Sequence, residues 1–577
     1  MKRFIYILMA VLAVLGITVS CSKAEIRKAT VMTQAEIDAH NGTSSDTDDP
    51  DEPDNPDNPD NPDNPDNPDN PDNPDGPDNP SEVTDGNYFV TLNGAGEKTG
   101  AIGHELDLSG FVAMVTDASN ASKLDGATFT FADGTYILGS DTNADGLRLE
   151  FASSVNLCFK GASGAVLSGN DKSRVITVGK NVNLTVEGLT LTKGKAGNGG
   201  VIYLEESRLI LKNVTVSGGY ATGHGGAVYV DKGFLRMEGC TVSGNRTDTG
   251  TAKNDNNGGG VYLSKTCEGA AFTGCSFLDN RIVTTSTDQW GGAVRIEPTD
   301  GPLTVDFDGC TFSGNFAKQG ACVSINVNNI ARFNRCEFSG NSANSRGMVQ
   351  VQTCVVFMND CSFSGNVTEA NNGWGVDIHG KGYLCLNNCT IYGNRNQSTT
   401  AGNNNVAING YHSMLMTGCT VIESNQLGLL RIDDNSGSQV LCNNILVNTS
   451  GKTVFIGNTT AAFQSLGHNA MSETTGFSTF SAHSTDLTSC SEASFGGGKL
   501  EGKVFTWNGS LSGFNPATQA DVESAMTEGF NVSLSGVMTN IGKEFHTWLS
   551  DMNPAGYTTD GRGVVRTGDF WPGAYQN

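Results

Sequence analysis

The sequence predicts an all-β solenoid, in which short parallel strands coil into a stack, and three observations lead to this prediction. The stretch "GGAVYVDKGFLRMEGCTVSGN", from Gly225 to Asn245, returns in altered form at Gly291 and at Gly320. A unit of about 25 residues is too short to bury a core of its own, whereas stacked units share one. The composition, with 73 Gly and 8% aromatic residues, is typical of a turn-rich β protein.

The position of Cys240 marks the phase of the repeat. Its equivalents, at intervals of 25 to 35 residues, are Leu189, Val214, Cys275, Cys310, Cys336, Cys361, Cys389, Cys419 and Asn444. The longer intervals contain polar insertions such as "RTDTGTAKNDNN", as expected for loops that leave one corner of a coil. Within a unit "AVYV" alternates, so we expect Val228 and Val230 to point inward and Tyr229 outward.

Charge and hydropathy divide the N-terminal region into three parts. Residues 1–20 have Lys2 and Arg3 ahead of a short apolar run, which indicates a signal peptide. The following "ITVSC" resembles the lipobox of bacterial lipoproteins, which implies acylation of Cys21 and anchoring in the bacterial outer membrane, with display at the cell surface. A plain secretory signal with an incidental Cys is the alternative. Residues 21–45 would be a tether.

Residues 46–85 form an Asp/Asn/Pro low-complexity spacer. A Pro at every third residue from Asp51 to Pro80 fixes φ near the polyproline II value and removes backbone donors. About 30 residues at roughly 3.1 Å each predict a stiff stalk on the order of 90 Å. A cation-binding acidic tract is the alternative.

Most of the net charge of −25 belongs to this spacer, because residues 41–85 hold 16 acidic residues and no Lys or Arg. No part of the chain has the basic patch that binding to nucleic acid requires. We therefore expect no nucleic-acid partner, and a membrane contact made only through the N-terminal lipid.

The remaining chain is expected to comprise an N-terminal cap with first coils (86–187), the β-helix repeats (188–448) and an irregular C-terminal cap region (449–577). Leu108, Phe111, Val112 and Val115 fall at helical spacing and predict a cap helix over the open end of the solenoid. A short helix is also predicted at "ATQADVESAM".

The paired motifs "GGAV" and "FSGN" resemble the polymorphic outer membrane protein repeat of chlamydial surface proteins. That resemblance implies the right-handed parallel β-helix of the pectate lyase-like fold over roughly Gly188 to Asn448. The C-terminal "DGRGVVRTGDFWPGAYQN" is similar to the ending of choice-of-anchor Q proteins, which implies an exported β-helix protein. The barrel that ends the chlamydial proteins is missing here.

Seven of the 15 Cys share the repeat phase. Neighbours in a parallel sheet lie about 4.8 Å apart, beyond the Cβ separation of roughly 3.8 Å that a disulfide prefers, so buried free thiols are expected. Bridges remain open for the out-of-phase Cys267, Cys322, Cys354, Cys385 and Cys442.

One stretch suggests a cation site. "DTNADGLRLEFA" resembles the first half of a calcium loop, with Asp141, Asn143 and Asp145 as candidate ligands. Ala152 stands where a bidentate Glu is needed, so a plain Asp/Asn/Gly turn is the alternative. No other cofactor is expected.

The outward face after each Gly-Gly corner is the expected ligand surface. One predicted column is Tyr203, Tyr229, Tyr262, Arg295, Ser324, Gln350, Asp377, Ala407 and Arg431, and its neighbour begins Glu205, Asp231 and Ser264. Exposed tyrosine faces beside carboxylates suit sugar rings and their hydroxyls. Tyr203, Tyr229, Tyr262, Glu205 and Asp231 are therefore the candidate ligand-binding residues; a solvated β-surface is the alternative.

Catalytic candidates gather at one end of this face and are Asp377, His379, Arg431, Asp433 and Asp434. They do not complete the motif of a pectate-type lyase or of a polygalacturonase-type hydrolase. The predicted function is a non-catalytic, lipid-anchored surface protein that binds polysaccharide or a host or neighbouring cell surface, in the manner of an adhesin. A polysaccharide lyase or glycoside hydrolase, and a purely structural rod, are the alternatives.

Overall fold

The computed structural model describes Val83 and residues 85–248, 256–283, 289–298, 303–368, 378–396, 406–410, 412–432, 439–457, 463–474, 480 and 482–490. All described residues belong to one unit of the chain, Pro77–Asn577. The predicted signal peptide, Cys21, the tether, nearly all of the spacer and the helix predicted near the C-terminus lie outside the described residues.

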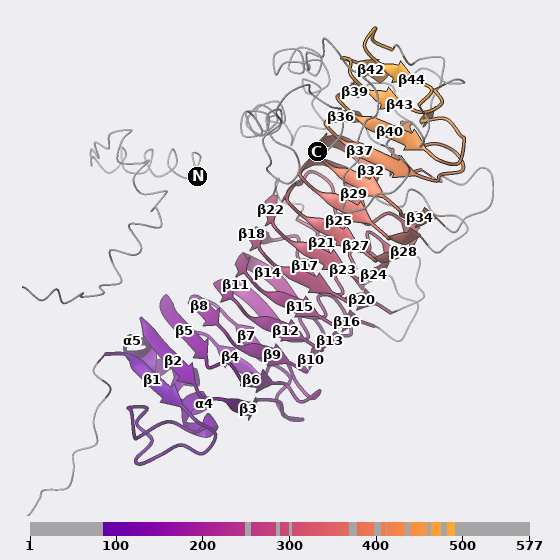
Figure 1. Ribbon diagram of the computed structural model, residues 1–577. Helices are drawn as coiled ribbons and strands as arrows, with labels where there is room; N and C mark the ends of the chain where they lie inside the picture. The colour runs from indigo at the N-terminus through magenta and orange to yellow at the C-terminus, as the bar shows by residue number, and fades with distance from the viewer. Residues whose placement is uncertain are drawn as a thin grey trace, which may run out of the picture. The chain divides into compact units, whose positions relative to one another are not determined.

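The described chain is a right-handed parallel β-helix, as predicted. Every pairing between named strands in it is parallel, and successive coils stack in sequence order (Figure 1). Each strand pairs with the equivalent strand of the next coil, so the backbone hydrogen bonds form between coils.

The largest of three sheets has 22 described strands. They are β1 Asn87–Val90, β2 Ala127–Phe131, β4 Leu147–Leu149, β5 Val155–Gly161, β7 Ile176–Val178, β8 Val182–Glu187, β11 Ile202–Lys212, β14 Val228–Glu238, β17 Val261–Leu263, β18 Cys267–Thr273, β21 Val294–Ile296, β22 Thr304–Asp308, β25 Val323–Ile325, β26 Ile330–Asn334, β29 Val349–Asn359, β32 Ile378–Asn387, β35 Ile408–Asn409, β36 Ser413–Thr417, β38 Leu430–Ile432, β39 Gln439–Cys442, β41 Phe455–Gly457 and β42 Phe463–Ser465.

The second sheet has 14 described strands and the third has eight. The second comprises β3 Gly134–Ile137, β6 Ala165–Ser168, β9 Thr190–Thr192, β12 Thr215–Ser217, β15 Thr241–Ser243, β19 Ser276–Leu278, β23 Thr311–Ser313, β27 Glu337–Ser339, β30 Ser362–Ser364, β33 Thr390–Tyr392, β37 Thr420–Glu423, β40 Ile445–Asn448, β43 Ala470–Met471 and β44 Leu487–Thr488. The third comprises β10 Lys195–Ala196, β13 Tyr220–Ala221, β16 Arg246–Thr247, β20 Arg281–Ile282, β24 Phe316–Gln319, β28 Ser342–Arg346, β31 Val367–Thr368 and β34 Arg395–Asn396.

The predicted repeat phase is confirmed along its whole length. Leu189, Val214 and Cys240 each precede a strand of the second sheet, and the residues that follow them pair in consecutive coils. The same relation continues through every predicted marker to Asn444. The pairing extends beyond residues 188–448 on both sides, from β3 to β44.

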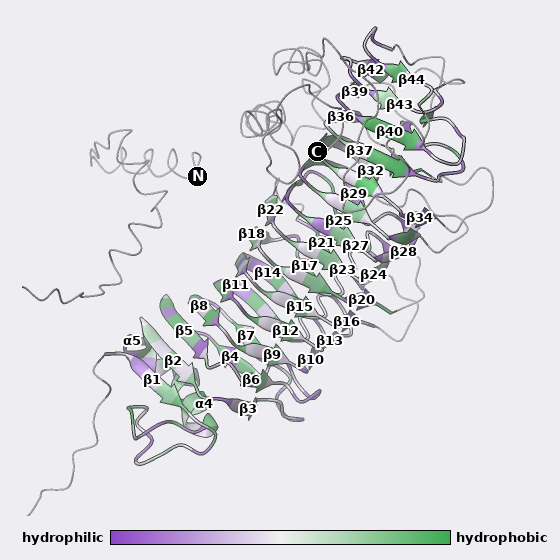
Figure 2. Cartoon of the chain, viewed as in Figure 1, coloured by the Kyte–Doolittle hydropathy of each residue, from purple (hydrophilic) through white to green (hydrophobic). Residues whose placement is uncertain are grey.

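Like side chains stack on like inside the coil. Phe272, Phe307 and Phe333 form one buried ladder with ring centroids 4.8 to 4.9 Å apart, and Phe277, Phe312, Phe338 and Phe363 form a second. Figure 2 shows the apolar colouring that runs along the strands. Because parallel strands repeat at about 4.8 Å, an inward aromatic column is automatically at stacking distance.

The predicted cysteine ladder is also present. Cys310, Cys336 and Cys361 are at most 1% exposed. All fourteen cysteines of the described residues are free thiols. Burial, followed by contacts with neighbouring thiols, raises the pKa of Cys361.

A buried asparagine ladder fixes one corner. Asn245, Asn280, Asn315, Asn341, Asn366 and Asn394 each donate from Nδ2 to the next side chain of the ladder at 2.7 to 3.1 Å, and Glu423 accepts from the last. Glycine permits close packing beside this ladder, because a Cβ on Gly226 would lie 2.1 Å from the carbonyl oxygen of Gly259 and 2.7 Å from the backbone nitrogen of Arg246.

The predicted cap helix is α4, Leu108–Thr116, which begins at the N-cap Asp107. Its Phe111 is fully buried and meets Phe129, Phe131 and Phe159 edge to face at 4.9 to 5.3 Å. The short helices η1 (Ala118–Asn120) and α5 (Ala121–Leu124) follow it at the same end (Figure 1). Within the described ranges, no helix has the length and apolar character needed to cross a membrane.

Candidate functional site

Three tyrosines stand in one outward column of the largest sheet. Tyr203 on β11, Tyr229 on β14 and Tyr262 on β17 are register neighbours, and each follows a glycine corner. Ring centroids are 5.1 Å apart between Tyr203 and Tyr229 and 5.2 Å apart between Tyr229 and Tyr262, with interplanar angles of 14° and 9°. We call these three residues the tyrosine ladder. Val228 and Val230, on either side of Tyr229, point inward as predicted.

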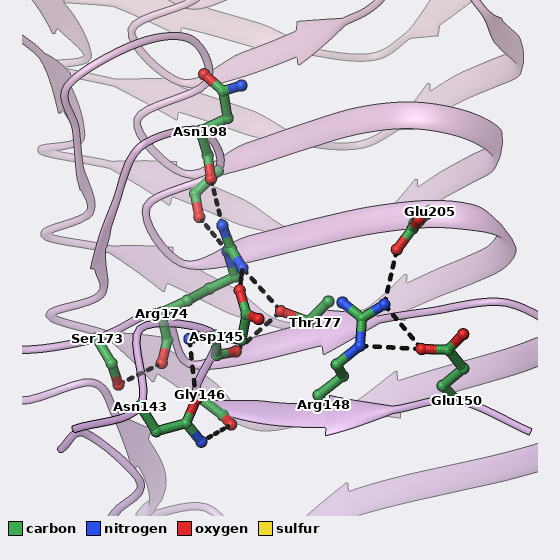
Figure 3. Close-up of polar contacts among 11 residues, drawn as sticks. Asn143, Asp145, Gly146, Arg148, Glu150, Ser173, Arg174, Thr177, Asn198 and Glu205 are labelled. Carbon is green, nitrogen blue, oxygen red and sulfur yellow. Dashed lines mark hydrogen bonds and ion pairs between the residues drawn. The ribbon is translucent and has the colours of Figure 1, made fainter.

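A buried arginine covers the first ring. The guanidinium of Arg174 lies 4.9 Å from the centroid of the Tyr203 ring and pairs with Asp145, with 2.8 Å between Nη1 and Oδ1. Figure 3 shows it held also by the carbonyl oxygen of Asn198, at 2.9 Å from Nη2, and by the hydroxyl of Thr177, at 2.8 Å from Nη1. Because these contacts hold the guanidinium from several sides, it is a rigid end to the ladder.

A second arginine joins two carboxylates beside the ladder. Arg148 donates to Glu150 from Nε at 3.0 Å and from Nη2 at 2.8 Å, and its Nη2 is 3.0 Å from Glu205 (Figure 3). Glu205 is thus an ion-pair partner rather than a free acceptor. Its half-exposed carboxylate still offers a second oxygen to a ligand.

Asp231 contacts the ladder directly, although its register differs from the prediction. The hydroxyl of Tyr203 donates to Oδ2 of Asp231 at 3.2 Å. The sequence alignment set Asp231 beside Glu205, but a β-bulge pairs Glu205 with Lys232 instead. A bulge adds one residue to one strand and shifts every later pair, which alternation of residue types does not reveal.

The far end of the ladder is buried, which corrects the expected open column. Tyr262 is 6% exposed, and the ring of His224 stacks on it at 4.3 Å. Arg295, the next residue in the register, is fully buried; it pairs with Glu297 and lies 4.7 Å from the ring of Trp290. The accessible part of the ladder is therefore its Tyr203–Tyr229 end.

The stacking also corrects the predicted mode of contact. The sequence predicts open tyrosine faces on which sugar rings could lie. Tyr203 and Tyr262 cover the two faces of Tyr229, and Arg174 covers Tyr203. Strands about 4.8 Å apart set consecutive rings at stacking distance, so the faces pack on one another and a ligand meets ring edges and hydroxyls.

All three phenols are held in the protonated form. Burial, then the charge of Asp231, raises the pKa of Tyr229 to about 12. The same two causes raise the pKa of Tyr203, and burial followed by the charge of Glu297 raises the pKa of Tyr262. At neutral pH these hydroxyls are hydrogen-bond donors and poor proton abstractors.

The accessible end is acidic overall. Four carboxylates surround it against two guanidinium groups, and the six residues are Asp145, Glu150, Glu205, Asp231, Arg148 and Arg174. Acceptors of this kind bind sugar hydroxyls, while the surplus of negative charge opposes an anionic ligand.

The register of the predicted column is wrong at the two positions after Gln350, whereas Arg431 stands in that column as predicted. Gln350 pairs with His379 rather than with Asp377, and His379 pairs with Asn409 rather than with Ala407. Side chains of a strand alternate with a period of two, so a shift by two residues keeps every residue on its predicted face. The alternation of residue types therefore could not show whether Asp377 or His379 stands in the column, nor whether Ala407 or Asn409 does.

The catalytic candidates are only partly described. His379 and Arg431 share one column, two coils apart, with Asn409 between them. Asp377, Asp433 and Asp434 lie outside the described residues. A convergent set around His379 and Arg431 is therefore still a hypothesis.

The three candidate calcium ligands make separate contacts. Asp145 pairs with Arg174, and Asp141 pairs with Lys172 at 2.6 Å. Asn143 closes its own turn, donating to the carbonyl oxygen of Gly146 at 2.8 Å. Within the described ranges, no cluster of three or more His, Cys, Asp or Glu could hold a metal ion. Calcium binding here stays a prediction.

Sequence reasoning missed Arg174 and Arg148. Thr177, on β7, occupies the ladder's column one coil before Tyr203, and Arg148 one coil earlier still. The alignment stopped short of these coils because no Gly-Gly pair precedes β7 or β4. Their strand alternation was the available signal.

No protein-family model and no curated protein sequence matches the chain. Solved structures resemble it at low similarity, and among them are the following three. The pectate lyase Pel9A has a TM-score of 0.35 and 14% identity, over 54% of this chain and 77% of that one. A tailspike protein double mutant of the E. coli bacteriophage HK620, in complex with a pentasaccharide, has a TM-score of 0.30 and 12% identity, over 70% and 78%.

The third is a mannuronic acid specific polysaccharide family 6 lyase from human gut microbiota, with a TM-score of 0.29 and 12% identity, over 81% of this chain and 99% of that one. All three scores lie below 0.5. The fold assignment therefore rests on the strand pairing of this chain, and the site on its own residues.

Proposed function

We propose that this chain is a non-catalytic glycan-binding protein, and that a neutral polysaccharide binds at the Tyr203–Tyr229 end of the tyrosine ladder. The observation that carries the proposal is the stacked ladder itself, which presents hydroxyl groups in register beside carboxylates. Stacking between Tyr229 and both its neighbours fixes the hydroxyls before a ligand arrives, so little side-chain entropy is lost on binding.

The charges select the ligand class. Carboxylates outnumber guanidinium groups at this end, so uronate or sulfate groups would meet repulsion, whereas neutral hydroxyls find acceptors in Asp231 and Glu205. A ligand along the ladder would extend across coils, because a solenoid offers long faces.

Binding without catalysis is supported by the state of the titratable groups. The tyrosines stay protonated, and arginines occupy Glu205 and Asp145. A proton-abstracting base and a free carboxylic acid are what a lyase or hydrolase needs. His379 and Arg431 lie in one column, two coils apart, and this placement favours an enzyme as the second candidate.

The test is a binding screen of the full chain against immobilised neutral and acidic polysaccharides. A Y203F/Y229F variant keeps the stacked rings and removes two hydroxyls; at about 1 kcal/mol for each lost hydrogen bond, we expect affinity for the bound neutral glycan to fall roughly tenfold or more. Tyr220→Phe is the matched control, since Tyr220 is a half-buried tyrosine of the third sheet. Full-strength binding by Y203F/Y229F contradicts the proposal.

The same samples distinguish the enzyme. An enzyme would release new reducing ends or unsaturated products that absorb in the ultraviolet. If such products appear and His379→Ala or Arg431→Ala abolishes them, the second candidate replaces the binding proposal. Binding without product, unchanged in these two variants, supports the proposal.

We further propose that the chain is displayed at the bacterial outer membrane through acyl groups on Cys21. The short apolar run ending in "TVSC" supports this, and two or three chains anchor stably at about 0.8 kcal/mol per buried methylene. Cys21→Ala should move the protein out of the membrane fraction, with Cys158→Ala as the control. Undiminished membrane association of Cys21→Ala contradicts this part.

A further inference from the structure

A second surface lies on the other side of the bulge that follows the tyrosine ladder. Two adjoining hollows, of about 350 Å³ and about 450 Å³, lie over the later halves of β11 and β14 and the strands before them. Asn183 and Arg208 line both hollows, so they form one groove across successive coils. Its size is in the range of ligand-binding clefts.

Arg208 is the central charge of this groove. It is exposed, and its guanidinium lies 4.9 Å from the centroid of the Phe234 ring. The contacts of the described residues give it no carboxylate partner, whereas Arg148, Arg174 and Arg295 each pair with one. A guanidinium held flat on an aromatic ring keeps its planar fork of donors for a carboxylate or sulfate.

Phe234 gives the groove an apolar surface. It is 39% exposed, one of few large apolar side chains of the described residues that are. Its register neighbour is Gly269, and a Cβ there would lie 2.5 Å from the Phe234 ring, so only glycine lets the ring lie over the next coil. The ring thus lies between the Arg208 guanidinium and the Gly269 position, and its exposed part offers apolar contact area to a sugar.

Amide groups complete the polar lining. Asn183, next to Arg208 in the register, donates from Nδ2 to Oδ1 of Asn156 at 3.0 Å and to Ser154 at 3.1 Å. These bonds fix the amide, and the contacts of the described residues leave its Oδ1 as an available acceptor. The smaller hollow is lined by Glu206 and Glu268 as well as by Arg208 and Lys232, so its charges balance. In the larger hollow Arg208 is the one charged residue of the lining, so this part of the groove favours an anion.

We propose that this groove is a second glycan site, and that it binds a sugar carrying an anionic group, with the carboxylate or sulfate on Arg208, the ring against Phe234 and a hydroxyl on Asn183. Its charge preference is opposite to that of the tyrosine ladder. The two sites are separated by the bulge at Glu205–Ser207 and share no residue. An acidic and a neutral segment of one polysaccharide, or two different ones, could then be held by the same chain.

The experiment measures binding of the full chain to an oligogalacturonate, to its carboxyl-reduced form, and to a sulfated oligosaccharide with its desulfated form. We expect the anionic probes to bind more weakly at high salt, and at least tenfold more weakly to the Arg208→Gln variant than to the wild type. Neither change should affect the neutral forms. A response to the carboxylated or to the sulfated probe alone identifies which group the site takes. Arg208→Lys should recover only part of the affinity, because the fork is lost.

Arg246→Gln is the matched control. Arg246 is likewise exposed, with its guanidinium 4.9 Å from the Tyr220 ring, but it lies on the third sheet. Equal losses in Arg208→Gln and Arg246→Gln would overturn the proposal, as would unchanged binding in Arg208→Gln or no binding of any anionic probe. Y203F/Y229F should bind the anionic probes normally, so failure of the ladder proposal and failure of this one give different results.

Discussion

The ring of Tyr229 lies 5.2 Å from that of Tyr262 and within 9° of parallel to it, although a whole coil and a polar insertion separate the two residues in the chain. The parallel register alone brings them together. The ladder is therefore part of what holds coils together as well as a surface for ligands, and its two roles can be separated by the choice of substitution.

Tyr229→Ala should destabilise the fold more than Tyr203→Ala. The central ring loses two stacked partners, which at about 0.5–1.5 kcal/mol for each aromatic pair lowers the free energy of unfolding by about 1–3 kcal/mol. Tyr229→Phe should change it little. Urea denaturation of the three variants is the measurement, and a Tyr229→Ala protein as stable as Tyr229→Phe would show that the stack contributes nothing.

The buried cysteine ladder predicts slow alkylation of its thiols in the native state. Cys310, Cys336 and Cys361 are at most 1% exposed, so a reagent in solution does not reach their thiols while the chain is folded. Iodoacetamide should label them only after unfolding, while the half-exposed Cys158 is labelled first. Peptide mass spectrometry identifies the sites. Rapid native labelling of all three would contradict their inward position.

The repeat phase, the inward cysteines and the cap helix were predictable because each depends on a strong local signal. Period-two alternation and the glycine corners fix which residues face inward, and helical spacing of Phe111 and Val115 marks the cap. The register at His379 was not predictable, because a two-residue shift preserves the alternation.

The candidate site was predictable only as a set of residues on one face. Tyr203, Tyr229 and Tyr262 do share a column, but the covering of their faces by one another and by Arg174 depends on tertiary contacts. Arg174 meets Asp145 across a coil where no repeated motif marks the alignment. Ion pairs between coils of unlike sequence leave no periodic signal.

Weakening the packing of the cap helix α4 should loosen the first coils. Phe111→Ala deletes a fully buried ring that meets three other phenylalanines, so it should cost about 3–5 kcal/mol. Hydrogen exchange should then increase first in β1, β2 and β5, because each coil is supported by its neighbours. Val112→Ala, at a partly buried position of the same helix, is the milder control. Uniform protection in Phe111→Ala would mean that α4 does not stabilise this end.

Glu423 predicts a pH dependence of stability. It ends the asparagine ladder, where its Oε1 accepts from Nδ2 of Asn394 at 2.7 Å, and it is 4% exposed. Burial raises the pKa of Glu423 to about 8 from an ordinary value of 4.5, against the lowering effect of the bonds from Asn394. In the unfolded chain the carboxyl ionises at the ordinary value. Its contribution to stability is therefore complete below about pH 4.5 and is lost as the pH rises through 8.

Glu423→Gln replaces the neutral acid by a neutral amide, which offers Asn394 the same acceptor and cannot ionise. Relative to this variant, the wild-type urea midpoint should fall steadily from pH 5 to pH 9, whereas Glu268→Gln, at an exposed position, should follow the wild type throughout. A difference between wild type and Glu423→Gln that is the same at every pH would show that the buried carboxyl keeps its ordinary pKa, and that the ladder ends on an ionised group.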